Sequence, residues 1–183
     1  MFLVPCLMLL GASEESDWYF TAGAFLETSE LKSDYLGTVK FDDESAFRFG
    51  LGTKLNEHWN LEFEFGTSEA YGIDSVGDPV FAEYSQSCFM VSRAIAIDEK
   101  VSLCPRAGLG ITSWDLLFLD AFGFVNADSG TDVTTIFGLN MEIEIADNVQ
   151  VYGGYRMQFT DVGGLYNAEA TQSGLMFGAS ISF

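Results

Sequence analysis

Apolar residues recur at every second position in eight segments of the chain. A β-strand places successive side chains on opposite faces, so this period predicts strands with one apolar face and one face of small, polar or charged residues. The alternation is clearest where Trp59, Leu61 and Phe63 face away from Glu62 and Glu64. The expected strands are residues 18–27, 46–55, 59–66, 84–97, 101–112, 137–145, 149–159 and 174–183.

The connections between these segments alternate in length. Three residues join the second strand to the third, the fourth to the fifth and the sixth to the seventh, whereas the other connections span about 14 to 24 residues. Short periplasmic turns and long extracellular loops are typical of bacterial outer-membrane barrels, and an even strand number lets the sheet close in lipid. The pattern predicts an all-β fold, an eight-stranded antiparallel up-and-down transmembrane β-barrel in the bacterial outer membrane.

A water-soluble barrel of the lipocalin kind is the competing interpretation, because it would turn the apolar face inward. Its narrow eight-stranded interior would have to hold Phe47, Phe49, Trp59 and Phe63. Lipid accommodates that bulk more easily, which favours the membrane barrel.

The first residues are expected to form a signal peptide. Residues 1–12 are the most apolar stretch, far shorter than the roughly 18 residues of a spanning helix. The stretch ends in the small residues Gly11, Ala12 and Ser13, and Glu14 begins a polar segment. We therefore expect a signal peptide at residues 1–13 and a barrel domain at residues 14–183, with a short buried strand as the alternative reading of the first segment.

Charged residues share the strand face that holds most glycines. Setting Leu55 across from Trp59 places Arg48 diagonal to Glu64, within cross-strand reach. Balanced pairs of this kind can satisfy one another in a lumen too narrow for bulk water, which predicts a plugged barrel. The expected lumen ion-pair network contains four residues of each sign: Arg48, Lys54, Glu62, Glu64, Arg106, Glu142, Glu144 and Arg156.

The expected strand register also predicts whether the two cysteines of the barrel can form a disulfide. Setting Ile97 across from Val101 puts Cys88 opposite Gly110, about 20 Å from Cys104 along the strands, so two free thiols are expected. Arg93 has the parity of the lipid-facing residues. Either it extends to the periplasmic interface or a bulge turns it inward.

Net charge is informative about the surface. The chain carries a formal charge of -19, and its acidic residues, Glu27 among them, concentrate in the expected loops and at their edges. This disfavours nucleic acid as a partner. Divalent cations or a basic surface partner, or simply solvated loops, remain the alternatives.

Catalysis is not expected. The single histidine, His58, occupies an expected periplasmic turn, and paired glutamates on one strand face serve a lumen network as readily as an acid–base dyad. No cofactor or metal site is predicted, and a lipid-modifying outer-membrane enzyme is the least favoured function.

One expected external loop is unusually apolar. Such a patch can bind an apolar ligand, a partner or the lipid surface, or it can extend the neighbouring strands as a hairpin. It motivates an alternative function as a channel or transporter for small hydrophobic molecules. The candidate interaction residues are Leu116, Leu117, Phe118, Phe122 and Phe124.

Several short runs in order resemble the eight-stranded domain of the outer-membrane protein A and X group. They begin at Asp17, Arg106, Gly138 and Gly154 and end at the terminal Phe183. The resemblance implies a monomeric barrel with a charged plug and a structural or adhesive role in the cell envelope; the surface partner stays unknown. It also places Glu142 at the acidic and Arg106 at a basic lumen position, whereas Tyr152 stands where the group often has another arginine.

The resemblance further implies insertion by the barrel-assembly machinery, which reads the C-terminal strand. The expected assembly signal is the apolar face of that strand, Leu175, Phe177, Ile181 and Phe183.

Overall fold

The computed structural model describes residues 18–33, 37–74, 77–120, 123–162 and 168–183. The expected signal peptide lies outside this part of the chain. The described strands are β1 (Trp18–Ser33), β2 (Gly37–Lys54), β3 (Trp59–Ile73), β4 (Pro79–Arg93), β5 (Ile95–Ala96), β6 (Val101–Asp120), β7 (Gly123–Ala146), β8 (Val149–Val162) and β9 (Ala168–Ser182). No helix in these ranges is long and apolar enough to cross a membrane.

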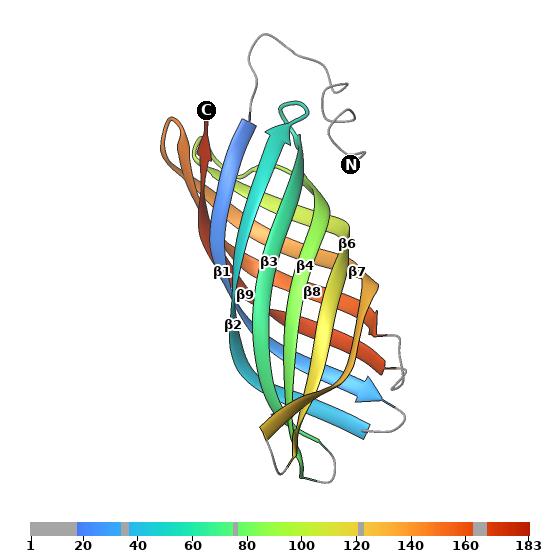
Figure 1. The fold of residues 1–183 in the computed structure, drawn as a ribbon. Helices are drawn as coiled ribbons and strands as arrows, with labels where there is room; N and C mark the ends of the chain where they lie inside the picture. The colour runs from blue at the N-terminus through green and yellow to red at the C-terminus, as the bar shows by residue number, and fades with distance from the viewer. Residues whose placement is uncertain (1–17, 34–36, 75–76, 121–122, 163–167) are drawn as a thin grey trace.

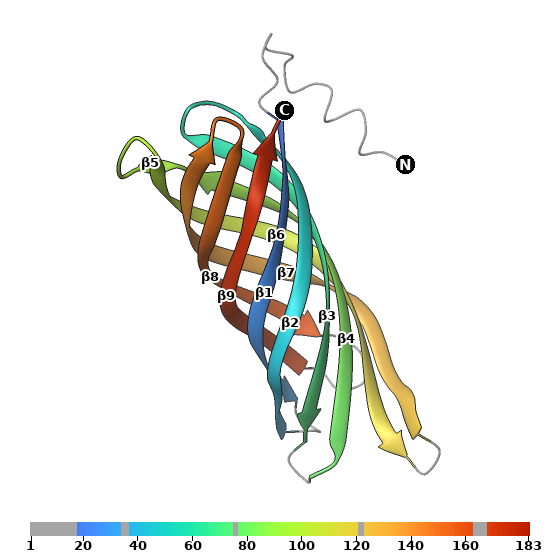
Figure 2. The ribbon, with the colours of Figure 1, turned by 90° about the vertical axis from the view of Figure 1, so that its left-hand side faces the viewer.

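The strands form one closed antiparallel ring (Figure 1). Apart from β4 and β5, which do not pair with each other, each strand pairs with its neighbours in the chain, β1 pairs with β9, and β4 pairs with β6. The short β5 continues β4 along the same partner strand beside a periplasmic turn, so the ring has eight positions (Figure 2). The predicted eight-stranded antiparallel barrel is confirmed.

Side chains in the half of the ring nearer the periplasm follow the predicted alternation. On β3, Phe63 is 40% exposed on the outer surface, whereas Glu62 and Glu64 are buried in the lumen. Except for the two-residue β5, the other strands also alternate between outward apolar residues and inward residues, and the outward apolar residues form a lipid-facing belt. The interpretation with this face turned inward is therefore wrong for the belt.

Glycines provide the space for bulky lumen side chains on adjacent strands. Arg48 lies directly opposite Gly66, and Arg106 lies opposite Gly138. A Cβ atom on Gly66 would stand 2.9 Å from Cγ of Arg48, too close for an undisturbed contact. An eight-stranded barrel is only wide enough for its own side chains, so each large residue requires a small neighbour.

The strands are longer than the sequence pattern predicted. They continue on the extracellular side of the belt, where the polarity of their two faces reverses. On β1, Leu31 faces the interior and Lys32 faces outward, whereas nearer the periplasm Leu26 faces lipid. On β2 the register shifts between Phe41 and Phe47, which changes the parity of the inward positions. Much of the sequence that was predicted to form loops therefore forms strands that extend beyond the belt on its extracellular side.

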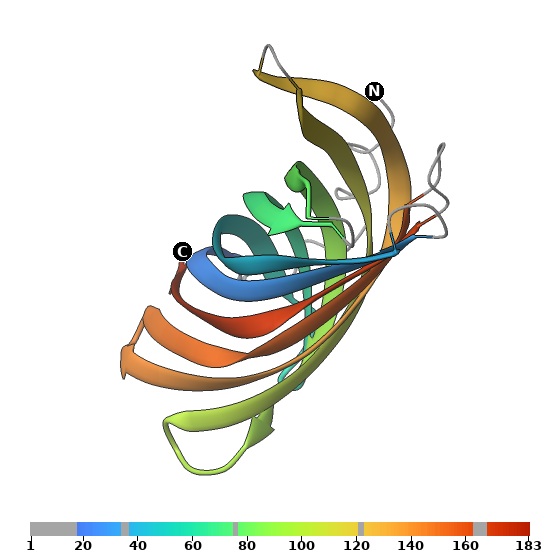
Figure 3. The same cartoon turned by 90° about the horizontal axis from the view of Figure 1, so that it is seen from below.

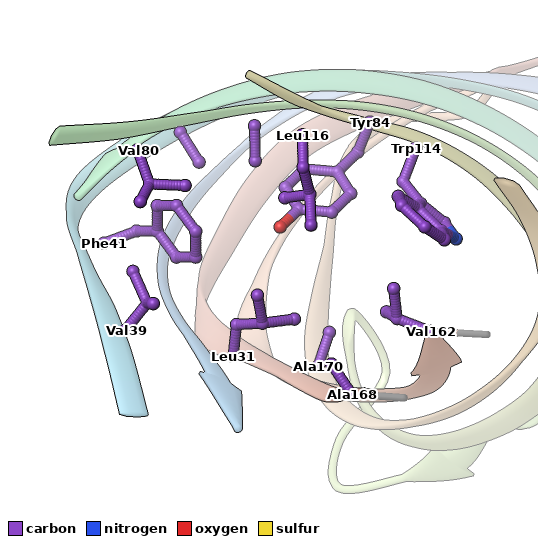
Figure 4. Close-up of a cluster of buried hydrophobic side chains, with 12 residues drawn as sticks. Leu31, Val39, Phe41, Val80, Tyr84, Trp114, Leu116, Val162, Ala168 and Ala170 are labelled. Carbon is purple, nitrogen blue, oxygen red and sulfur yellow. The ribbon is translucent and has the colours of Figure 1, made fainter. Parts of the chain in front are cut away.

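The reversed part of the barrel has an apolar interior, here called the mouth cluster (Figure 4). All its members are buried, and they point into the barrel from seven of the strands. Packing of this kind is that of a soluble protein core. The mouth cluster comprises Leu31, Val39, Phe41, Ala70, Val80, Ala82, Tyr84, Trp114, Leu116, Val162, Ala168 and Ala170.

The ring is not complete at its extracellular end. Pairing of β7 with β8 ends at Thr134 and Thr160, although β7 continues as far as Gly123 against β6. Viewed from this end, the β6–β7 hairpin curves away from the other strands (Figure 3). The wall therefore opens between β7 and the end of β8.

The Gly66→Ala variant tests the fit between glycines and lumen arginines. The added methyl group would crowd Arg48, and we expect the free energy of unfolding to fall by about 1–3 kcal/mol. Urea titration of the barrel in detergent, followed by gel migration with and without boiling, measures this. Gly153→Ala is the matched control, because its Cβ would meet no atom closer than 3.9 Å. Equal stability of the two variants would contradict the fit.

Candidate functional site

The centre of the lumen holds one carboxylate among three guanidinium groups. Glu64 on β3 forms ion pairs with Arg48 of β2 at 3.5 Å, with Arg106 of β6 at 3.8 Å and with Arg156 of β8. The Arg156 side chain is 0% exposed. Because three strands send their arginines to one residue of a fourth, Glu64 ties the opposite walls of the barrel together.

A second carboxylate and one amide complete this network. Arg106 Nη2 donates to Glu62 Oε1 at 2.9 Å. The amide oxygen of Gln86 accepts hydrogen bonds from Arg48 at 2.9 Å and Arg156 at 3.0 Å. Neutral and charged acceptors therefore share the terminal guanidinium nitrogens of the three arginines, while Nε of Arg48 and of Arg106 has no hydrogen-bond partner among the described residues.

Phe25 and Glu27, which the sequence analysis did not place in the network, also face the lumen. The guanidinium carbon of Arg48 lies 5.1 Å from the Phe25 ring centroid, and that of Arg156 lies 6.0 Å away. Glu27 was expected at the edge of a loop, yet it is 2% exposed. With it, the buried charges of the described residues balance at three arginines and three glutamates.

Three predicted members of the network lie elsewhere. Lys54 is exposed, and Glu142 and Glu144 are half-buried; no salt bridge joins any of them within the described ranges. Glu142 and Lys54 line a cavity of about 600 Å³ at the periplasmic end, which Glu62 and Arg106 of the network also line. The resemblance placed Arg106 at a basic and Glu142 at an acidic lumen position without assigning their partners, and Arg106 is directed to Glu62 and Glu64.

Uncharged polar residues form the next layer toward the cell surface. The hydroxyls of Thr112, Thr134 and Thr160 make a chain across β6, β7 and β8 with spacings of 2.5 and 2.7 Å. Gln158 donates to Gln172 at 2.9 Å beside them. The mouth cluster follows, so the lumen passes from a polar cavity through charges and hydroxyls to an apolar layer.

The predicted interaction loop is not one exposed patch. The described backbone of this segment belongs to β6 and β7, as the hairpin alternative implied. Leu116 is 1% exposed within the mouth cluster, and Leu117 is half-buried on the outer face. Phe118 lies opposite Val80 and Phe124 opposite Leu119 in the backbone register, while Phe122 lies outside the described residues.

The remaining predictions concern residues on the walls of the barrel. Cys88 lies opposite Gly110 as predicted, and Cys88 and Cys104 are free and buried. Arg93 is exposed on the outside, 5.8 Å from the Trp59 ring, and β4 and β5 share one register with β6. The outward alternative for Arg93 is therefore correct. The residues of the expected assembly signal, Leu175, Phe177, Ile181 and Phe183, are all exposed on the outer surface.

Comparison with known proteins identifies the class. Residues 2–183 match the model of the outer membrane protein beta-barrel domain, and the chain belongs to this family. It is a protein of the bacterial outer membrane. No curated protein matches the sequence.

Solved structures share the fold at low sequence identity. Neisserial surface protein A is 15% identical with a TM-score of 0.59, and the match covers 91% of this chain and 97% of that one. Ail, the attachment invasion locus protein of Yersinia pestis, in complex with the heparin analogue sucrose octasulfate, is 18% identical with a TM-score of 0.54 and coverages of 91% and 99%. The protease OmpT of Escherichia coli is 7% identical with a TM-score of 0.53 and coverages of 91% and 97%. The fold thus accommodates different roles.

The Glu64→Gln variant tests the central ion pairs. It keeps the volume but removes the charge shared by three buried arginines, so we expect a loss of about 3 kcal/mol in unfolding free energy. Urea unfolding in detergent gives the value. The same substitution at Glu30, whose pair with Lys32 is solvent-exposed, should cost less than about 0.5 kcal/mol. A similar small change at both sites would contradict a central role for Glu64.

Proposed function

We propose that this protein is a monomeric outer-membrane barrel with a structural and surface-interaction role, a plugged lumen and no catalytic activity. The observation that carries the proposal is the Glu64 network, in which side chains from β2, β3, β6 and β8 meet across the lumen. An ion entering the barrel would have to displace charge-assisted hydrogen bonds from a site without bulk water.

The mouth cluster supports the plug independently. Its side chains are buried against one another on the extracellular side of the ion pairs. An apolar constriction excludes ions even where it leaves room for motion, because dehydrating an ion is costly. Two layers of opposite chemistry therefore stand in series along the same path.

The outer surface supports interaction with something other than a polyanion. Ail was solved with a heparin analogue. This chain carries a net charge of -19, while the buried charges of its described residues cancel. Sulfated ligands would be repelled, so the proposed surface partner is cationic. The lipid bilayer and the assembly machinery, reading the exposed apolar face of β9, are the other proposed partners.

Single-channel recording in planar bilayers tests the plug. We expect inserted wild-type barrels to give no discrete openings above the background, because both lumen layers are closed. Heat-modifiable migration of the same sample on a gel verifies that the barrel is folded. Regular openings that scale with the number of inserted barrels would disprove the plug.

A second candidate function is lateral passage of small hydrophobic molecules. It rests on the end of β7–β8 pairing at Thr134 and Thr160, where a cavity of about 610 Å³ opens. The cavity is lined by the inward Thr160 and Ala170 and by the outward Val133 and Phe159. A wall that opens beside the lipid-facing belt offers an apolar molecule a route that avoids the central ion pairs.

Crosslinking across this opening tests the second candidate. In a Val133→Cys, Asp161→Cys variant, a bismaleimide would close the gap, and uptake of a fluorescent naphthylamine by expressing cells should fall to that of cells without the barrel. The control pair is Thr28→Cys with Ser173→Cys, because those residues lie opposite each other on a fully paired seam. Unchanged uptake after complete crosslinking at the gap would exclude lateral passage.

A further inference from the structure

A second apolar surface lies on the outside of the barrel, on the extracellular side of the lipid-facing belt. Tyr71 is 46% exposed and Ile73 is 55% exposed on β3. Tyr71 lies opposite Phe81 on β4, which lies opposite Leu117 on β6, and Ile73 lies opposite Pro79. These residues form one patch across three strands, here called the outer patch: Tyr71, Ile73, Pro79, Phe81 and Leu117.

The outer patch is separate from the belt. Tyr71 follows Phe65 of the belt by six positions on β3, about 20 Å along the strand at ~3.4 Å per residue. The outward residues between them are Thr67 and Glu69, both exposed and polar. Polar residues therefore separate the patch from the belt, and a contiguous apolar surface beyond such a border indicates an interaction site.

A row of carboxylates borders the patch on the side nearer the membrane. Glu69 lies opposite Glu83, and Glu83 lies opposite Asp115, on the same three strands and the same outer face. Like charges directly opposite one another destabilise a sheet, and opposite charges from a partner would relieve the repulsion. The geometry points to an occupant that places basic residues beside apolar ones.

We propose that the outer patch and this carboxylate row dock a cationic amphipathic polypeptide. This inference deepens the proposed surface-interaction role and rests on it. A second copy of this chain would set the same carboxylates against each other, and the phosphates of outer-leaflet lipids would be repelled. An extended segment that alternates basic and apolar residues has the chemistry that matches both rows.

The test measures binding of a short, fluorescein-labelled peptide of alternating lysine and leucine. The barrel is held in nanodiscs of uncharged phosphatidylcholine, and anisotropy is read against empty discs and against a glutamate–leucine peptide. We expect binding to the barrel above the empty discs, absent for the acidic peptide and weakened by added salt. Binding equal to empty discs, or equal binding of the acidic peptide, would overturn the proposal.

Matched variants locate the site. Tyr71→Ser with Ile73→Ser, and separately Glu69→Gln with Glu83→Gln, should each weaken binding by about tenfold. The control, Asp161→Asn with Glu169→Gln, makes the same charge change at another exposed cross-strand pair and should stay within about twofold. Heat-modifiable migration verifies that all variants fold. An equal loss in the control would show attraction to net charge alone and overturn the site.

Two further outcomes separate this inference from the rest. Association of barrel-containing discs with one another, lost in the Tyr71→Ser, Ile73→Ser variant, would assign the patch to a second copy and overturn the peptide proposal. Conducting barrels that still bind the peptide would disprove the plug and leave the docking site intact, so the two failures are distinguishable.

Discussion

Pairing of every backbone N–H and C=O group within the hydrocarbon region is the constraint on which the rest of this structure depends. It closes the sheet into a ring, and a ring of eight strands has an interior that side chains alone fill. From this follow the glycines opposite Arg48 and Arg106, since a larger residue would occupy the space of the arginine. The lumen charges must then find partners across the lumen, because their side chains are buried from solvent.

On the extracellular side of the belt, the apolar and polar faces of the same ring are exchanged. Water surrounds the outside there, so apolar residues such as Leu31 and Trp114 turn inward and Lys32 turns outward. The lipocalin-like arrangement, with the apolar face turned inward, is wrong for the belt but describes this extracellular part of the barrel. One closed sheet thus passes through two solvents by reversing its faces, and on β2 the shift in register between Phe41 and Phe47 makes the reversal possible without turning the strand.

This reversal also explains which features were predictable from sequence. Strand order, the register of Cys88 and the ion pair of Arg48 with Glu64 follow from alternation counted outward from short turns. Glu27 was expected at the edge of a loop and Leu116 within one, because the alternation with apolar residues facing outward ends near both positions. The parity of Phe25, Glu27 and Leu31 continues unbroken along β1 and was the available signal. The partner of Arg106 was not predictable, because the choice between Glu62 and Glu142 depends on how side chains cross the lumen.

Buried and exposed charged residues differ in how substitutions at them affect the barrel. Buried charges balance within the described residues, and each arginine is tied to acceptors on other strands, so a change there alters stability before it alters any surface property. The outward carboxylates Glu69 and Glu83 face water and one another, and replacing either relieves repulsion instead of breaking a pair. Their position side by side is therefore unfavourable to the isolated barrel, and binding of the proposed cationic polypeptide would relieve this repulsion.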